Sequence, residues 1–226
     1  MQALVMFQNK KPVIAIDGTA GSGKGTLAKK IANVLNFDHL DSGLLYRILA
    51  YEFLKLNRNL KMLSDVNIDL NIFLDKKKIK IMNLRSEKIT KISSEIAKLK
   101  FVRQKLVSLQ RKFANFPPNG IGSVIDGRDI TSVIIPNAEI KFYIDADVKI
   151  RAERRLTQLD LPIDSYNKIL KELIQRDFQD KRRKISPLIQ TTDSHFINTS
   201  KISESEVLIK AIDHIKRKQI LFSDCI

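Results

Sequence analysis

The stretch VIAIDGTAGSGKGT at residues 13–26 decides the fold of this 226-residue chain. Its first four residues are continuously apolar, which predicts a strand buried on both faces of a sheet. The chain has only eight glycines, and four of them fall within residues 18–25. From residue 24 to residue 36, apolar side chains recur at helical spacing. The stretch therefore predicts a buried strand, a glycine-rich loop and a helix in direct succession.

The glycine-rich loop is typical of a P-loop, which binds the phosphates of a nucleotide. Glycines let successive backbone N–H groups turn inward around phosphate oxygens, and the N-terminus of the next helix adds partial positive charge. Lys24 stands where it reaches the β- and γ-phosphates. A dinucleotide-binding turn would need a third glycine where Thr26 stands. The predicted ATP-binding residues in this loop are Gly18, Thr19, Ala20, Gly21, Ser22, Gly23, Lys24, Gly25 and Thr26.

Strands and helices alternate over most of the remaining chain. Further strands are predicted at 37–40, 123–125, 140–144 and 195–198, with helices at 44–56, 148–159, 165–183 and 203–219. Such alternation predicts an α/β fold, a doubly wound parallel sheet of the P-loop NTPase type.

One region breaks the alternation. Residues 69–84 alternate with a period of two, which predicts an antiparallel hairpin, and residues 94–113 form a basic amphipathic helix. We interpret residues 62–114 as an inserted subdomain of a single domain, whose core comprises residues 1–61 and 115–226.

Composition excludes several classes of protein. Hydrophobic residues make up 43% of the chain and charged residues 29%, which is typical of a globular protein. No apolar run reaches the ~18 residues of a membrane span. The apolar patch at residues 3–7 precedes the first lysines, the reverse of a secretory signal. The single cysteine, Cys225, excludes a disulfide framework. We expect a soluble cytoplasmic protein.

The net charge of +15 invites a nucleic-acid interpretation. We consider nucleic-acid binding unlikely, because aromatic residues are not interleaved with the basic runs. A small polyanionic substrate fits the positive potential equally well. No long heptad seam demands a partner helix, so a monomer is expected.

A second polar constellation, DSGLLYR, occupies residues 41–47 after the second predicted strand. Ser42 alone would be explained as a helix cap. Arg47 lies one turn later, where it can reach a phosphate over the helix N-terminus. Tyr46 is equally consistent with packing and with ligand contact. We predict that Ser42 and Arg47 bind a phosphate.

A third constellation, DGRD, occupies residues 126–129 at the end of a predicted parallel strand. The carboxyl ends of such strands face the ligand crevice of the sheet. Arg128 is predicted to bind phosphate, and Asp129 to accept a hydrogen bond. Mg²⁺ is the expected metal, held by phosphates, water, the hydroxyl group of Thr26 and the hydration-shell carboxylate Asp126.

In combination, these motifs resemble the bacterial cytidylate kinases, P-loop enzymes that phosphorylate CMP and dCMP from ATP. The resemblance spans nearly the whole chain and includes SEIA…VR at 94–103, RAERR at 151–155 and RDFQDKRRKISPL at 176–188. It implies that the inserted subdomain binds the nucleoside monophosphate and that residues 151–183, including Arg151, form a mobile lid. Together these would exclude water from the reaction.

The resemblance also implies individual roles. Ser94, Arg103 and Asp129 would read cytosine, because a carboxylate suits its amino group and a guanidinium suits its acceptors. Uracil would leave Asp129 facing an oxygen. The implied CMP-binding residues are Ser42, Tyr46, Arg47, Ser94, Arg103, Asp129, Arg176, Asp180 and Arg183; the implied catalytic residues are Lys24, Arg128 and Arg155, with Arg154 at ATP.

Some positions depart from the family pattern. Thr131-Ser132 stands in place of Gly-Thr, and Gln179, Lys181 and Ser93 replace arginines. These departures leave two alternatives open. One is another nucleoside monophosphate kinase with UMP or AMP as acceptor. The other is a catalytically weak nucleotide- or RNA-binding protein on the same scaffold.

Overall fold

The computed structural model describes residues 11–55, 84 and 86–218. The chain divides into two compact units, Met1–Leu40 with Arg111–Ile226, and Asp41–Gln110. The second unit thus begins before residue 62, where the sequence placed the start of an insert. The hairpin predicted at 69–84 lies, except for Leu84, outside the described residues.

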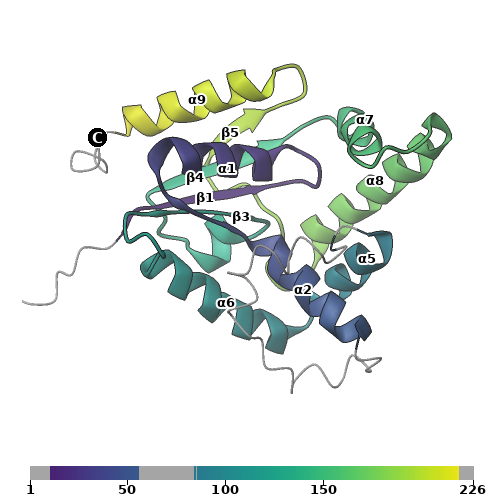
Figure 1. Cartoon of the computed structure of the whole chain (residues 1–226), viewed down its shortest axis with the longest axis horizontal. Coiled ribbons are helices and arrows are strands. Elements are labelled where there is room, and N and C mark those ends of the chain that lie inside the picture. The colour runs from purple at the N-terminus through teal and green to yellow at the C-terminus, as the bar shows by residue number, and fades with distance from the viewer. Residues whose placement is uncertain (1–10, 56–83, 85, 219–226) are drawn as a thin grey trace, which may run out of the picture. The chain divides into compact units, whose positions relative to one another are not determined.

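The first unit is built on a five-stranded sheet in the order β2-β3-β1-β4-β5 (Figure 1). The central strand β1 pairs in parallel with β3 on one side and β4 on the other, and β4 pairs in parallel with the edge strand β5. This arrangement confirms the predicted parallel α/β fold. The strands are β1 (Val13–Gly18), β2 (Asp38–Asp41), β3 (Ser123–Gly127), β4 (Ile140–Asp145) and β5 (His195–Asn198).

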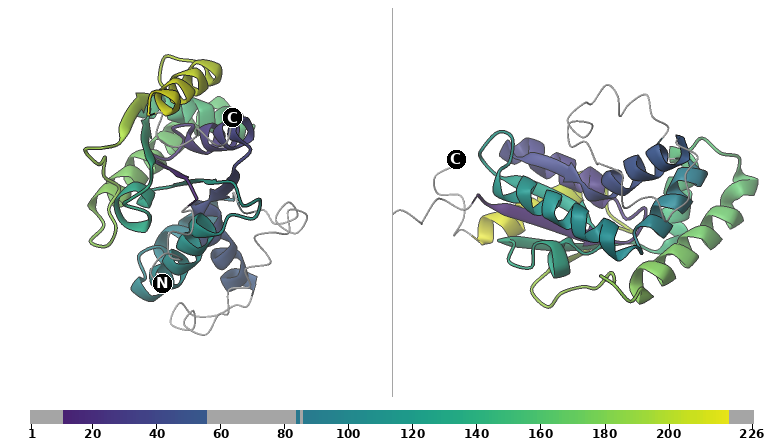
Figure 2. Two further views of the ribbon diagram at one scale, coloured as in Figure 1. Left: turned by 90° about the vertical axis from the view of Figure 1, so that its left-hand side faces the viewer. Right: turned by 90° about the horizontal axis from the view of Figure 1, so that it is seen from below.

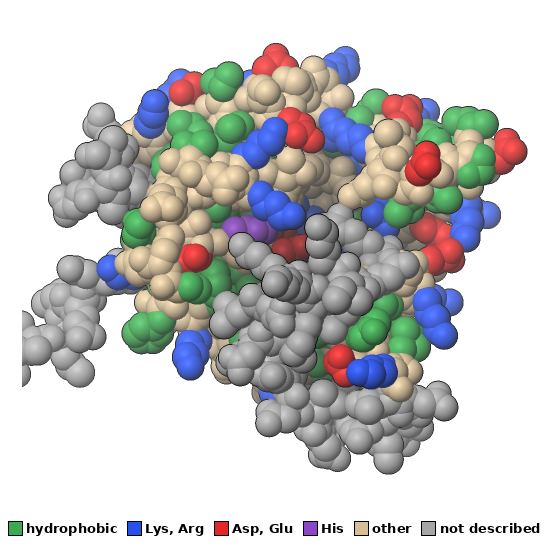
Figure 3. Space-filling view, viewed as in Figure 1, with side chains coloured by type: hydrophobic (Ala, Val, Ile, Leu, Met, Phe, Trp, Pro, Cys, Tyr) green, Lys and Arg blue, Asp and Glu red, His purple; other side chains and the backbone are tan. Residues whose placement is uncertain are grey.

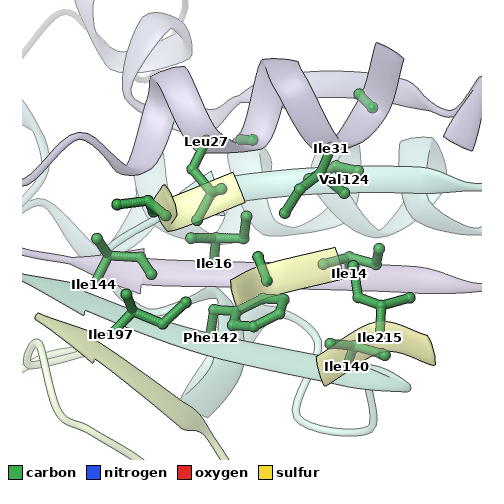
Figure 4. Close-up of a cluster of buried hydrophobic side chains, with 14 of the residues drawn as sticks. Ile14, Ile16, Leu27, Ile31, Val124, Ile140, Phe142, Ile144, Ile197 and Ile215 are labelled. Carbon is green, nitrogen blue, oxygen red and sulfur yellow. The ribbon is translucent and has the colours of Figure 1, made fainter. Parts of the chain in front are cut away.

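The main hydrophobic core lies between this sheet and helices α1 (Lys24–Leu35) and α9 (Glu204–Arg217). Figure 4 shows Leu27 and Ile31 of α1 pointing toward Ile14 and Ile16 of β1. The largest fully buried side chain is that of Phe142 on β4. Burying such side chains contributes about 1.5–3 kcal/mol each, and this packing fixes the P-loop between β1 and α1.

Helices α7 (Val148–Gln158) and α8 (Tyr166–Arg182) pack side by side (Figures 1 and 2). The short 3-10 turn η3 (Ile163–Ser165) precedes α8. A second hydrophobic cluster joins Ala152 of α7 and Ile169 and Leu173 of α8 to Ala20 in the P-loop. The segment predicted as a lid is therefore packed on the phosphate loop.

A π-helical turn, η2 (Ile130–Ile134), follows β3 and was not predicted. The N–H groups of Ile134 and Ile135 donate to carbonyl oxygens five residues earlier, at 3.0 and 2.8 Å. Ile130 and Ile134 are buried, and the turn packs against β1 and β3. Packing and side-chain anchoring, rather than local propensity, hold this turn.

The second unit contains α2 (Ser42–Lys55), α5 (Glu87–Ile96) and the first part of α6 (Lys100–Asn115). The single helix predicted at 94–113 was wrong, because the chain turns between Ile96 and Lys100. At this break the guanidinium of Arg103 donates to the carbonyl oxygen of Ala97 at 3.1 Å. A side chain thus satisfies a carbonyl group that a continuous helix would have bonded internally.

On the face shown in Figure 3, lysine and arginine side chains are scattered and acidic side chains lie among them. Among the described residues visible on that face, the basic side chains do not form a continuous stripe of the kind that follows a nucleic-acid backbone. No helix in the described part of the chain has the length and apolarity needed to cross a membrane.

Candidate active site

The P-loop runs from the end of β1 into α1, and its geometry requires glycine at several positions, of which Gly18 and Gly21 are examples. A Cβ atom on Gly18 would lie 2.0 Å from the carbonyl oxygen of Ile144, so β1 and β4 approach too closely for any side chain. Gly21 has a φ of +77°, which side chains rarely adopt. Helix α1 starts at Lys24 without an acidic residue in its first turn. Its N-terminal N–H groups can therefore face an anion.

Polar contacts fix the shape of this loop. The hydroxyl group of Thr19 donates to Asp145 Oδ1 at 2.5 Å, and the hydroxyl group of Ser22 donates to the carbonyl oxygen of Thr19 at 3.0 Å. Lys24 Nζ also donates to that carbonyl, at 3.2 Å. The lysine predicted to reach the phosphates is thus folded back along its own loop.

Asp126, at the end of β3, is 3% exposed. One of its oxygens, Oδ1, lies 2.7 Å from Nε2 of His39 on β2. The other oxygen, Oδ2, would lie 3.6 Å from a Cβ atom on Gly25. The carboxylate therefore has one oxygen held by a histidine that sequence reasoning missed, and the other directed toward the start of α1.

A cluster of arginines surrounds Asp180 on α8. Arg128 Nε donates to Asp180 Oδ2 at 2.8 Å. Arg176 and Arg183 approach the same carboxylate at 3.9 and 3.8 Å. Arg183 also approaches Asp129 Oδ1 at 3.6 Å. The fold thus brings three guanidinium groups together with two carboxylates. These groups come from two segments of the chain that are separate motifs in the sequence.

The charges in this cluster are strongly coupled. Burial alone would raise the pKa of Asp180, but the cations of Arg128, Arg176 and Arg183 outweigh that effect and lower it below its ordinary value. Burial would lower the pKa of Arg128, and Asp180 raises it instead. The cluster joins three guanidinium groups to two carboxylates, and the excess of one cation suits a bound phosphate.

The arginines of α7 have different partners, and of the hydrogen bonds described here only that of Arg151 reaches the P-loop. Arg151 is 4% exposed and donates to the carbonyl oxygen of Ala20 at 3.0 Å, while its other terminal nitrogen lies 2.6 Å from Asp177 of α8. Arg154 donates to the hydroxyl and carbonyl oxygens of Thr199. Arg155, predicted to be catalytic, donates to Gln158. Arg151 thus ties the loop to α8.

Asp17 is a second residue that sequence reasoning missed. It is completely buried on β1, and its carboxylate accepts from the backbone N–H groups of Ile130 and Thr131 at 2.9 and 2.7 Å, and from the hydroxyl group of Thr131 at 2.7 Å. Burial raises the pKa of Asp17 to about 6, against the opposing effect of these hydrogen bonds. Asp17 anchors the π-helical turn directly after Asp129.

In the second unit, Ser42 is 5% exposed at the start of α2. Asp41 caps this helix, because its Oδ1 accepts from the N–H group of Leu44 at 3.1 Å. The hydroxyl group of Ser42 is therefore not required as the cap, which was the plain alternative to ligand binding.

The second unit also brings together Tyr46 and Arg103, whose guanidinium lies 5.9 Å from the centre of the tyrosine ring. Arg103 is 4% exposed. Ser94 on α5 donates to the carbonyl oxygen of Thr90 at 3.1 Å. Arg47 lies half-buried on α2. The predicted CMP-binding residues are thus divided, with Asp129, Arg176, Asp180 and Arg183 in the first unit and Ser42, Tyr46, Arg47, Ser94 and Arg103 in the second.

Comparison with known proteins identifies the family. The family model of cytidylate kinase matches residues 14–217. The cytidylate kinase of Bartonella bacilliformis is 42% identical over 205 residues, which cover 88% of this chain and 92% of that protein. That of Neisseria meningitidis is 36% identical over 221 residues, 92% of this chain and 99% of that protein.

Among solved structures, an uncharacterized protein from Eubacterium ventriosum has the same fold, with a TM-score of 0.55 and 18% identity over 91% of this chain and 99% of that one. The family model extends from β1 through α9, and so includes the P-loop and the arginine cluster. On these grounds the chain belongs to the cytidylate kinase family.

Proposed function

We propose that the protein transfers the γ-phosphoryl group of ATP to CMP or dCMP, giving ADP and CDP or dCDP. The observation that carries this proposal is the arginine cluster around Asp180, which lies in the same compact unit as the P-loop. A P-loop alone would serve many NTPases. The arginine cluster is a second group of cations, and one of its members, Arg128, directly follows β3. Such a group can hold the phosphate of an acceptor nucleotide.

The choice of acceptor rests on Asp129 and Arg103. Asp129 accepts hydrogen bonds, which suits the amino group of cytosine, and the Arg103 guanidinium suits the ring acceptors. A uracil ring would leave the Asp129 carboxylate against an oxygen, which costs about 1–3 kcal/mol when both are desolvated. Discrimination against UMP of about tenfold to a hundredfold follows.

The residues present fit Mg²⁺. Thr26 and Asp126 are hard oxygen donors at the start of α1 and the end of β3, and Asp126 Oδ2 is directed toward the loop. The described residues contain no group of three or more His, Cys, Asp or Glu side chains placed for a metal ion. The nucleotide phosphates and water would therefore supply most ligands. Bound there, Mg²⁺ would neutralise charge on the phosphates.

Phosphoryl transfer mainly requires positioning and charge neutralisation. The amides at the start of α1 and Lys24 would hold the β- and γ-phosphates of ATP. The Arg128, Arg176 and Arg183 guanidinium groups would hold the acceptor phosphate, and Arg154 and Arg155 would add charge near ATP. The attacking atom is a phosphate oxygen, so no strong general base is needed.

Initial rates of ADP release with CMP, dCMP, UMP and AMP at a fixed ATP concentration test the proposal. We expect CMP and dCMP to be the preferred acceptors, and Lys24→Met to lower the rate at least about a hundredfold. A preference for UMP or AMP would reassign the acceptor. CMP-independent ATP hydrolysis, or unchanged rates in Lys24→Met, would overturn the mechanism. We also propose that the protein is cytoplasmic and monomeric. Sedimentation of the purified chain would test the monomeric state, and fractionation of cells would test the location.

A further inference from the structure

A cavity of about 420 Å³ lies between the edge strand β5 and helix α9 in the first unit. Its volume falls in the range of small-molecule sites. It is separate from the residues proposed to bind nucleotides, since none of them lines it. The lining residues come from every position of β5 and from one face of α9: His195, Phe196, Ile197, Asn198, Lys210, Asp213, His214 and Arg217.

The cavity wall carries an excess of positive charge. Lys210 and Arg217 face one carboxylate, Asp213. In the described part of the chain, neither basic side chain forms a hydrogen bond or an ion pair. Most other basic groups near the candidate active site are paired with carboxylates, as Arg128 and Arg151 are. Asp213 and, for Lys210, Glu206 one turn earlier on α9 offset part of this charge. The lining itself still holds two cations and one carboxylate, and such an excess in a concave site favours an anion.

Two imidazole rings form part of the same wall. His195 and His214 stack with ring centres 4.0 Å apart and an angle of 15° between their planes. Both rings also pack edge-on against Phe142. Burial, followed by the repulsion of nearby cations including Arg217, lowers the pKa of each histidine. Burial and the neighbouring positive charge thus both disfavour protonation of the rings, and a bound anion would offset the second of these effects.

We propose that this cavity binds a small oxyanion, a molecule bearing phosphate or several carboxylates, between Arg217, Lys210 and the stacked histidines. The Arg217 guanidinium group and the Lys210 ammonium group would supply charge-assisted hydrogen bonds. The imidazoles and the Asn198 amide supply further donors. A metal cation is disfavoured here because Lys210 and Arg217 would repel it.

Affinity for the anion rises as the pH falls, because a bound anion favours the protonated histidines. The charged groups that face the two rings are Lys210, Asp213, Arg217 and Lys218 on α9. On the neighbouring strand β4, Lys141 directly precedes Phe142, the register partner of His195, and forms an ion pair with Asp193. Among the residues that line the cavity, Asp213 is the only carboxylate that could stabilise a protonated ring in place of the bound anion.

The three histidines of the chain allow a direct test by proton NMR on the full-length protein. His195 and His214 report on the cavity, and His39 reports on the candidate active site through Asp126. The imidazole resonances are titrated with pH in sodium pyrophosphate, in citrate and in sodium chloride of equal ionic strength. Variants His195→Gln and His214→Gln assign the resonances.

We expect pyrophosphate, citrate or both to raise the titration midpoints of the two cavity histidines by about 0.3 pH or more. A response to pyrophosphate alone identifies a phosphate site, and to citrate alone a carboxylate site. The double variant Lys210→Gln/Arg217→Gln should weaken the response at least about tenfold. Lys216→Gln, an exposed residue of α9 outside the cavity, should not.

Two results would overturn the proposal. One is unchanged midpoints of the cavity histidines at anion concentrations that move the His39 resonance. The other is an equal response in the double variant and in wild type. The histidine midpoints are read without any turnover, so this outcome does not depend on whether the proposed kinase activity is correct. If that activity is correct, the double variant should phosphorylate CMP at the wild-type rate.

Discussion

Replacing Asp180 with asparagine tests whether one carboxylate holds the arginine cluster together. Asp180 faces three guanidinium groups at 2.8, 3.8 and 3.9 Å. At an effective dielectric constant of about 20, unit charges 4 Å apart interact by about 4 kcal/mol. Desolvation offsets part of this attraction, and removing one partner of a buried ion pair costs about 3–5 kcal/mol. The Arg128 and Asp180 side chains are each 15% exposed, which places the expected loss at the lower end.

We therefore expect Asp180→Asn to lower the free energy of unfolding by about 2–3 kcal/mol at pH 7, or the Tm by about 4–12 °C. The pKa of Asp180 lies below 3.8 in the folded protein. Its stabilisation is therefore complete above the unfolded-state pKa and is lost as the pH falls below it. Urea unfolding of both proteins between pH 3 and pH 7 measures the difference.

The difference between the two proteins should shrink as the pH falls below 3.8. Asp164→Asn, on the exposed turn before α8, is the matched control and should change the stability by less than about 0.5 kcal/mol. If Asp180→Asn changes the free energy of unfolding at pH 7 by as little as the control does, the carboxylate does not hold the cluster together. A difference that stays constant down to pH 3 would show that something other than its charge is responsible.

Gly18→Ala should prevent folding or abolish ATP binding, because the added Cβ meets the carbonyl oxygen of Ile144; a calorimetric titration with ATP on soluble protein checks this. His39→Gln should retain most activity and His39→Ala should lose about tenfold in kcat, since the glutamine amide can replace Nε2 beside Asp126; rates against Mg²⁺ concentration compare the two. Asp129→Asn should narrow the preference for CMP over UMP by about tenfold, measured as a ratio of kcat/KM values. Equal behaviour of the two His39 variants would contradict the positioning role.

The parts of the fold that sequence predicts are those in which local pattern and tertiary packing agree. Apolar spacing located α1 and α9, and the glycines located the P-loop, because only glycine fits at Gly18. The π-helical turn and the break between α5 and α6 were not predicted. Both depend on side chains distant in sequence or one turn away, Asp17 and Arg103. No local periodicity encodes such contacts.

The candidate site divides in the same way. Residues in contiguous motifs, such as Asp126 and Arg128, were found from their position after a strand. His39 was not, because its partner Asp126 is 87 residues away on the adjacent strand and a histidine in a short strand carries no signal of its own. The convergence of Arg128 with Asp180 likewise depends on how α8 returns to β3, which the motifs do not specify.

In the first unit, the departures from the expected pattern are neighbours in sequence of the proposed phosphate-binding cluster and not members of it, whereas Ser93 belongs to the second unit. In the described part of the chain, the side chains of Gln179 and Lys181 form no hydrogen bond or ion pair, while Arg128, Arg176 and Arg183 all approach Asp180. Thr131, another of the positions at which the sequence departs from the expected pattern, has a hydroxyl group that donates to Asp17. Of the positions in the first unit, only Gln179 lacks a charge that an arginine would carry, since Lys181 is still a cation, and no member of the cluster is removed. Salt screens the interaction of exposed charges outside the cluster with a bound phosphate. It screens the largely buried contacts within the cluster much less. We therefore expect the proposed phosphoryl transfer to depend on Arg128, Arg176 and Arg183 and not on an arginine at position 179 or 181.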